Sequence, residues 1–307
     1  MKLKKFIAVM ATVGMVASLA VGCGGSSEDT SAEGGDAAAE GSSDWDSSMD
    51  ITIVSREDGS GTRGAFIELF GIEEEVDGEK VDMTTEEAQI TNSTSVMLTT
   101  VAGDDYAIGY VSLGSLDDSV KALKIDGAEA TAENIKSGDY KVSRPFNIAT
   151  KTDMNNPTAK DFISFIMSQE GQDVVAEEGY IPLDGAEAYA GDAPAGKVVV
   201  GGSSSVSPVM EKLIEAYAEV NPDAEIELQT TDSTTGMESA ISGAYDIGMA
   251  SREVKEDELS AGLEAQVIAT DGIAVVVNNN NPTDELTSDQ VKSIYTGEAL
   301  TWDEVVE

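Results

Sequence analysis

The sequence predicts an α/β fold in which short strands alternate with helices along residues 51–307. Short apolar runs typical of strands alternate with longer segments whose apolar residues recur every three to four positions, as they do in helices. In addition, loops rich in Ser, Thr and Gly separate several strand ends from the helices that follow. This alternation favours mainly parallel sheets covered by helices.

The expected elements follow from these patterns. Strands are expected at residues 51–55, 106–113, 146–151, 197–202, 224–229, 246–251 and 272–278. Helices are expected at residues 63–71, 156–179, 208–222, 236–245 and 287–297. Pro157 suits a helix start and Thr287 suits an N-cap. Residues 186–196 are mostly small and read as a surface connector.

Length and charge limit the classes of function. The 307 residues suit two modest domains or one large one. The formal net charge of −40 argues against a nucleic-acid-binding protein, because neutralising phosphate backbones takes many Lys and Arg side chains. An anion bound by so acidic a chain would be held by local hydrogen bonds rather than by the overall field.

Histidine is absent, and Cys23 is the single cysteine. These counts exclude His-dependent catalytic triads, the usual zinc sites, an intrachain disulfide and a thiolate cluster. No metal or cofactor is therefore expected.

The N-terminus has the parts of an export signal. Basic residues within 2–5 precede an apolar stretch, 6–22, which ends directly before Cys23. This resembles a bacterial lipoprotein signal peptide over residues 1–22, with lipid attached at Cys23 and the protein held on the extracytoplasmic face of the cell membrane. The alternative is an N-terminal membrane helix that contains the cysteine, although 6–22 is short for a span of about 20 residues. Residues 23–49 are mostly Gly, Ser, Ala and acids and read as a flexible tether.

Three loops share one design, a strand end, a run of Ser, Thr and Gly, and a helix start. They are "EDGSGTRG" (57–64), "GGSSSVSP" (201–208) and "DSTTGME" (232–238), and a fourth loop, "ASRE" (250–253), also follows a strand. Helix N-termini present backbone N–H groups and partial positive charge, which favour anions. Any one loop could merely cap its own helix, but their combination in one α/β chain favours an anion site at the carboxyl ends of the strands.

Enzymatic alternatives lack their motifs. A Walker P-loop needs GxxxxGK[ST], and "GSGTRG" has neither the Lys nor the spacing. A nucleophile elbow needs a His partner, which this chain cannot supply. The protein is therefore not expected to be an enzyme.

Four segments together resemble a known family. They are "VSREDGSGTRGAF" (54–66), "GGSSSVSPVMEKLIEAY" (201–217), "GMASREV" (248–254) and "DGIAVVVNNNNP" (271–282). They resemble the PstS family, the phosphate-binding subunits of bacterial ABC transporters, over nearly all of residues 51–307. The resemblance implies a two-lobed, type II periplasmic-binding-protein fold that holds inorganic phosphate in the cleft between the lobes and delivers it to the permease subunits.

The resemblance also implies the phosphate ligands. These would be Arg56, Ser60, Gly61, Thr62, Ser204, Ser205, Ser233 and Ser251. Asp58 would orient the Arg56 side chain rather than contact the anion. Some family members carry, at the position of Ser251, an aspartate that accepts the proton of hydrogen phosphate. Here the acceptor could be Ser251, Asp58 or a backbone carbonyl.

The order of the segments departs from the family, in which "GGSSSVSP" comes first and "SREDGSGT" near the middle. The chain therefore looks circularly permuted, with the connector at 186–196 joining the old ends. The alternative is a slice of a tandem array. Permutation predicts a continuous first lobe, residues 141–277, and a split second lobe, residues 50–140 plus 278–307.

Other functions stay open on the sequence alone. A binder of another tetrahedral oxyanion, such as sulfate or molybdate, would use similar loops. A phosphate sensor or a surface interaction module could reuse the same fold. A phosphatase is the enzymatic alternative, and no nucleophile–base pair supports it.

Overall fold

The computed structural model describes residues 45–305. The predicted signal peptide, Cys23 and most of the predicted tether lie outside that range. Within it, the main sheet has the strand order β10-β9-β11-β8-β12-β5-β1-β4, and β6 pairs with β12 beside this path. Two small two-stranded sheets, β13-β7 and β2-β3, complete the β-structure of this range.

The described chain up to residue 142 supplies one set of elements. Its strands are β1 (Thr52–Arg56), β2 (Glu73–Val76), β3 (Glu79–Asp82), β4 (Gln89–Thr91), β5 (Ala107–Ser112), β6 (Val120–Ala122) and β7 (Lys124–Ile125). Its helices are α1 (Gly61–Leu69), α2 (Thr94–Ala102) and α3 (Ala132–Ser137), with a 3-10 turn η1 (Leu113–Ser115).

The rest of the described chain supplies the second set. Its strands are β8 (Ser143–Lys151), β9 (Gly196–Ser203), β10 (Ala224–Thr231), β11 (Ile247–Ala250), β12 (Leu263–Asn278) and β13 (Glu285–Leu286). Its helices are α4 (Pro157–Ile166), α5 (Gln169–Glu177), α6 (Ser207–Val220), α7 (Ser233–Ser242), α8 (Glu256–Ser260) and α9 (Ser288–Tyr295), with a 3-10 turn η2 (Trp302–Glu304).

The main sheet is mixed rather than mainly parallel. β9 pairs parallel with β10 and β11, and β1 pairs parallel with β4 and β5, as expected from the alternation. However, β8 is antiparallel to both β11 and β12, and β12 is antiparallel to β5. Strand direction across the middle of the sheet depends on long-range pairing, so the local pattern could not show it.

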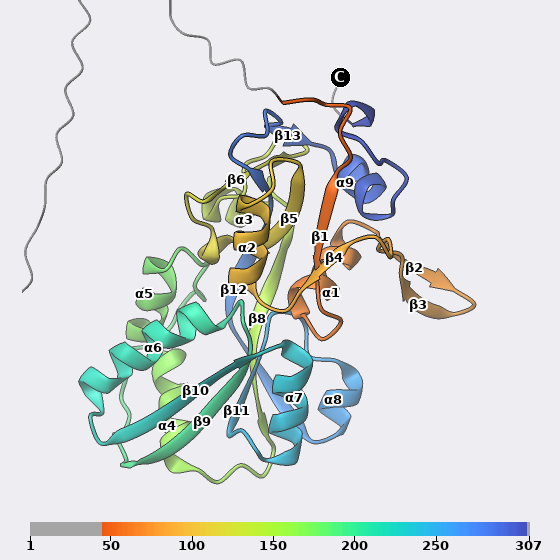
Figure 1. Ribbon diagram of the computed structural model, residues 1–307. Helices are drawn as coiled ribbons and strands as arrows, with labels where there is room; N and C mark the ends of the chain where they lie inside the picture. Colours follow the sequence, from red (N-terminus) through yellow and green to blue (C-terminus); the bar gives the residue numbers. More distant parts are fainter. Residues whose placement is uncertain (1–44, 306–307) are drawn as a thin grey trace, which may run out of the picture. The chain divides into compact units, whose positions relative to one another are not determined.

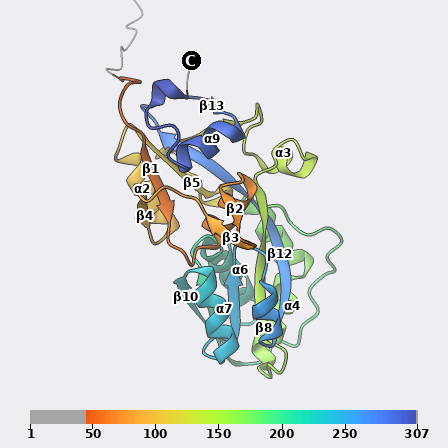
Figure 2. The same ribbon diagram turned by 90° about the vertical axis from the view of Figure 1, so that its right-hand side faces the viewer.

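Two groups of elements lie on either side of β8 and β12. Residues 263–272 of β12 pair with β8, and residues 273–277 pair with β5 (Figure 1). Figures 1 and 2 both show β8 and β12 side by side, and Figure 1 shows β9–β11 below them and β1 and β5 above. The long strand β12 therefore passes from one lobe into the other and, with β8, forms the hinge between them.

Each lobe has its own hydrophobic core. One large buried cluster draws its residues from 51–142 and 273–305. A second large cluster and a smaller one draw theirs from 146–269. Phe66, Tyr110 and Tyr295 pack together in the first core, and Phe162 and Tyr217 in the second. Separate cores leave the surface between the lobes free to be polar.

The single helix expected at 156–179 is instead two helices. α4 ends at Ile166, and Ser168 caps α5 by accepting a hydrogen bond from the Gly171 amide at 3.3 Å. A Cβ atom at Gly171 would lie 2.2 Å from the Phe165 carbonyl oxygen, so the sharp change of direction depends on glycine there. Apolar spacing alone did not reveal this cap.

The two ends of the described chain lie together. Asp50 and Thr301 form an antiparallel bridge, and the Ile51 amide donates to the Leu300 carbonyl at 2.8 Å. Packing against the lobe begins before residue 50, because the Trp45 ring stacks on Tyr106 with centroids 5.8 Å apart. The predicted tether therefore ends earlier than residue 49. Along residues 45–305, no helix is both long enough and apolar enough to cross a bilayer.

Candidate functional site

The Ser- and Thr-rich loops meet where helices begin. α1, α6 and α7 follow β1, β9 and β10, and α2 follows β4, each after a short polar loop. Ser60, Ser93 and Asp232 cap α1, α2 and α7 through their side chains, whereas α6 has no side-chain cap. Four helix N-termini therefore face one region, with β1 and β4 in one lobe and β9 and β10 in the other.

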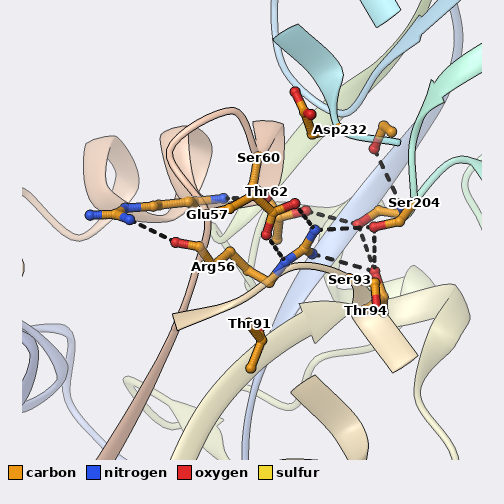
Figure 3. A network of polar contacts seen from close by, with 12 residues as sticks. Arg56, Glu57, Ser60, Thr62, Thr91, Ser93, Thr94, Ser204 and Asp232 are labelled. Atoms are coloured by element: carbon orange, nitrogen blue, oxygen red, sulfur yellow. Dashed lines mark hydrogen bonds and ion pairs between the residues drawn. The ribbon is translucent and has the colours of Figure 1, made fainter. Parts of the chain in front are cut away.

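Arg56, the last residue of β1, is the charged group of this region. Its side chain is buried, and Nη2 donates to the Ser204 hydroxyl of the opposite lobe at 3.1 Å (Figure 3). Nη1 lies 3.5 Å from the Thr94 hydroxyl. The Tyr110 hydroxyl accepts from the Arg56 amide at 3.1 Å and fixes the end of the strand. Because a guanidinium group has five N–H donors and no acceptor, Arg56 can only donate toward the cleft.

Hydroxyl groups connect the lobes around Arg56. The Thr62 hydroxyl lies 2.8 Å from that of Ser205, and the Thr94 hydroxyl lies 3.3 Å from Ser204 and 3.2 Å from Ser205. Eight buried hydroxyl side chains line this part of the cleft, and they are Ser60, Thr62, Thr94, Ser203, Ser204, Ser205, Ser233 and Ser251. Hydroxyls rotate to donate or accept, so this set can adapt to an oxyanion.

Ser233 and Ser251 complete the far wall. The Ser251 amide donates to the Ser233 hydroxyl at 3.1 Å, and the Ser203 hydroxyl donates to that of Ser251 at 2.9 Å. The Thr62 hydroxyl reaches Ser251 at 3.5 Å from the other lobe. The structure thus brings Arg56, Gly61, Thr62, Ser204, Ser205, Ser233 and Ser251 together, whereas the Ser60 side chain caps α1 beside them.

Two glycines allow the lobes to approach. A Cβ at Gly61 would lie 2.4 Å from the Ser233 hydroxyl oxygen and 2.8 Å from that of Ser251. A Cβ at Gly59 would lie 2.3 Å from a carboxylate oxygen of Asp232. The Gly59 carbonyl accepts a hydrogen bond from the Thr234 amide at 3.2 Å. The loop between β1 and α1 therefore touches the opposite lobe through backbone atoms.

The expectation for Asp58 is corrected. Arg56 pairs with Glu57 instead, through Nε and Nη2 at 2.8 Å each. Asp58 pairs with Arg63 at 2.9 Å, and its side chain is 97% exposed. Arg63 also binds Asp82 at 2.8 Å, which holds Arg63 away from the hydroxyl cluster.

Sequence reasoning missed three residues of the cleft. Thr94 opens α2 and touches both Ser204 and Ser205, and Ser203 supports Ser251. Glu57 carries the ion pair with Arg56. The signal for Thr94 was present, because "TNSTSVM" repeats the design of a polar loop before a helix, although the strand before it has only three residues.

The side chains of the cleft are suited to donating hydrogen bonds. Among residues 45–305, no three acidic, His or Cys side chains group to hold a metal. Burial raises the pKa of Tyr110 to about 12, so its hydroxyl stays protonated at neutral pH. Arg56, the hydroxyls and four helix starts together suit a small oxyanion.

Known proteins resemble this chain closely. The family model described as a PBP superfamily domain matches residues 36–170 and 187–306. "Phosphate-binding protein PstS 2" of Streptococcus agalactiae serotype V is 60% identical over 256 residues, 83% of this chain and 87% of its own length. The protein of the same name from Streptococcus pneumoniae serotype 4 is 40% identical over 306 residues, 99% of this chain and 100% of its own. The crystal structure of a phosphate-binding protein of a phosphate ABC transporter from Streptococcus pneumoniae TIGR4 matches with a TM-score of 0.67 and 42% identity, over 84% of this chain and 100% of that one.

Proposed function

Because the chain belongs to the PstS family of the PBP superfamily, we propose that it captures inorganic phosphate outside the cytoplasm and delivers it to the permease of an ABC transporter. Family membership also confirms the two-lobed periplasmic-binding-protein fold. The relatives are named as binding proteins, which supports a role for this chain as a binder rather than an enzyme.

One observation carries the proposal. Arg56 and eight buried hydroxyls converge between four helix N-termini, and they come from both lobes. Helix N-termini and charge-assisted hydrogen bonds from Arg are the preferred partners of phosphate oxygens. A ligand held by both walls stabilises the arrangement in which the lobes touch, which is the basis of hinge closure.

The proposed ligands divide between the two lobes. Arg56 donates charge-assisted bonds, and residues 60–62 donate from the start of α1. Ser204 and Ser205 act from the opposite wall, as do Ser233 and Ser251. Thr94 joins this set because it lies within hydrogen-bonding distance of Ser204 and Ser205.

Selectivity for phosphate over sulfate requires an acceptor for the phosphate proton. Asp58 drops out of that role because it faces solvent and pairs with Arg63. The choice is left between the Ser251 hydroxyl and backbone carbonyls of the cleft. Ser251 is fully buried beside Ser203 and Ser233, which places its hydroxyl in the wall itself.

We propose further that the order of the chain is a circular permutation. The adjacent ends at Asp50 and Thr301 support this, since joining neighbouring ends and opening another loop preserves a fold. The Streptococcus pneumoniae relative matches this chain over its full length, so the two chains share the same order of segments. This favours a permutation over a slice of a tandem array. The two separate cores support one continuous lobe and one split lobe, but residues 273–277, expected in the continuous lobe, pack in the core of the split lobe.

The membrane attachment is also a proposal. The pattern of residues 1–23 supports cleavage before Cys23 and a lipid anchor on its sulfur. The acidic tether would keep the folded lobes clear of the bilayer and within reach of the permease subunits. Mass spectrometry of the membrane fraction tests this, with a diacylglycerol adduct at Cys23 as the expected result.

Calorimetry with the purified chain tests the central proposal. Phosphate should bind with measurable heat, and Arg56→Ala should weaken binding by about 1.5–3 kcal/mol, the scale of a hydrogen bond to a charged group. Heat with sulfate or molybdate but not phosphate would assign another oxyanion. Hydrolysis of a phosphate ester by the wild-type chain, lost in Arg56→Ala, would replace the binding role with that of a phosphatase.

A further inference from the structure

A buried polar cluster lies at the hinge, outside the hydroxyl cleft. Arg144 of β8 and Asp271 of β12 are cross-strand neighbours and form an ion pair at 3.0 Å. Both side chains are buried, at 2% and 0% exposure. Two residues further along, β12 leaves β8 and pairs with β5. The pair therefore occupies the point where the chain passes from one lobe to the other.

Tyr180 connects this pair to the lobe that contains β1 and β5. It follows α5, and its neighbour Ile181 forms a bridge with Thr270, directly before Asp271. The Tyr180 ring packs on Phe146 at 5.3 Å between centroids, within the core formed by residues 146–269. Its other end lies against Gly114 of η1, where a Cβ atom would be 2.1 Å from the ring carbon Cζ. Tyr180 thus bridges the two lobes beside the ion pair.

The cluster has unused hydrogen-bonding capacity. Of the buried side-chain atoms in residues 45–305 without a hydrogen-bond partner, six come from this place: Ser112 Oγ, Ser115 Oγ, Arg144 Nε, Arg144 Nη1, Tyr180 OH and Asp271 Oδ1. These atoms are near one another, since Asp271 pairs with Arg144 and the Tyr180 ring lies against Gly114, which stands between Ser112 and Ser115 in the chain.

Unpaired buried polar groups raise the free energy of the arrangement that contains them. Here the arrangement is the one in which Arg56 and Thr62 touch Ser204 and Ser205 across the cleft. A rotation about β8 and β12 would move Gly114 and Ser112 relative to Tyr180 and Asp271, and would admit water or align partners. Tyr180 belongs to one lobe and Ser112 and Ser115 belong to the other, so the cost of their unpaired hydroxyls depends on how the two lobes are arranged.

We propose that Arg144, Asp271, Tyr180 and Ser112 form a hinge spring that opposes closure of the lobes. The spring keeps the phosphate-free cleft accessible and limits how tightly phosphate is held, so that the anion can be released to the permease. This role rests on the proposed function, because closure on phosphate supplies the energy that the spring opposes. It concerns the hinge alone and adds no contact to the anion.

Tyr180→Phe and Ser112→Ala test the spring, because each removes an unpaired hydroxyl and keeps the packing. Removing Arg144 or Asp271 singly would leave a buried charge, so those variants are less informative. Tyr140→Phe is the control, since the Tyr140 hydroxyl is also buried beside β12 but donates to the Ile273 carbonyl at 2.7 Å. Single-molecule energy transfer between dyes at Glu79→Cys and Glu219→Cys, in a Cys23→Ser background, reports the distance between the lobes.

In phosphate-free protein, Tyr180→Phe should raise the ratio of molecules with a short dye-to-dye distance to molecules with a long one about fivefold. Ser112→Ala should act in the same direction. Tyr140→Phe should leave that ratio unchanged. Phosphate affinity should rise in Tyr180→Phe by a similar factor. Unchanged or longer dye-to-dye distances in both hinge variants would overturn the spring, whether or not these variants bind phosphate. If the distances shift but no variant or wild-type chain binds phosphate, the spring stands and the proposed function fails.

Discussion

Glu57 holds the guanidinium of Arg56, the residue directly before it, through two hydrogen bonds of 2.8 Å to Nε and Nη2. This fork leaves Nη1 and the second hydrogen of Nη2 for Thr94 and Ser204. The orientation of the charged group of the cleft is therefore set within one dipeptide. Arg56 has little freedom to turn away, because its side chain is almost fully buried.

Glu57→Gln should weaken phosphate binding by about 1 kcal/mol, because the amide NH2 group of Gln cannot replace the second accepting oxygen of the carboxylate. Calorimetry measures this, with Asp58→Asn as the control. That variant changes an adjacent carboxylate whose side chain is exposed, and its affinity should match that of the wild type. Tighter binding in Glu57→Gln would mean that Glu57 acts by charge repulsion and not by orienting Arg56.

Gly61→Ala should prevent the lobes from meeting. The new methyl group would lie 2.4 Å from the Ser233 hydroxyl oxygen and 2.8 Å from that of Ser251, and both serines are fully buried. Phosphate affinity should fall at least tenfold while thermal stability changes little. Gly64→Ala, one turn along the same helix, has open space at its Cβ and should keep the affinity and gain up to about 1 kcal/mol of stability. Equal affinities in the two variants would separate Gly61 from the site.

Tyr110 links alkaline stability to the end of β1. Burial raises its pKa from 10.0 to about 12, so the stabilisation it gives is complete below pH 10 and is lost as the pH rises to 12. The loss can reach about 3 kcal/mol. Tyr110→Phe should be less stable at neutral pH, through lost bonds to Ser55 and Arg56, yet its free energy of unfolding should fall less between pH 10 and 12. Parallel curves for the two proteins in denaturant titrations would contradict this.

Asp161 anchors the connector at 186–196. Its carboxylate accepts from the hydroxyls of Tyr189 and Tyr217 at 2.6 Å each, and from the Asp192 amide at 2.9 Å. Asp161→Asn should lower the free energy of unfolding by about 1–3 kcal/mol, because an amide cannot satisfy the same donors. Phosphate affinity should be retained. The exposed side chain of Asp192 supplies the control, Asp192→Asn, and a similar loss in that variant would exclude a specific role for Asp161.

The sequence was sufficient for the local pattern of the fold. The expected strands at 51–55 and 197–202 are present as β1 and β9, and Thr287 caps α9 as expected. These elements follow from short-range periodicity and capping chemistry. The antiparallel pairing of β8 and β12 depends on contacts between residues more than 100 positions apart, which no local pattern records.

The site was predictable in kind and less so in detail. Loop composition identified the helix N-termini, because Ser, Thr and Gly at those places have a physical reason to be there. The partner of Arg56 was not predictable, since Glu57 and Asp58 follow the last residue of β1, where the strand alternation no longer fixes the direction of a side chain. Thr94 was missed because α2 follows a strand of only three residues.

The most direct test of the phosphate cleft is a crystal structure of the chain with arsenate, whose anomalous scattering locates a tetrahedral anion without ambiguity. The predicted anomalous peak lies between the lobes, within hydrogen-bonding distance of Arg56, Thr62 and Ser205. A peak elsewhere on the protein, with the hydroxyl cleft empty, would contradict the account.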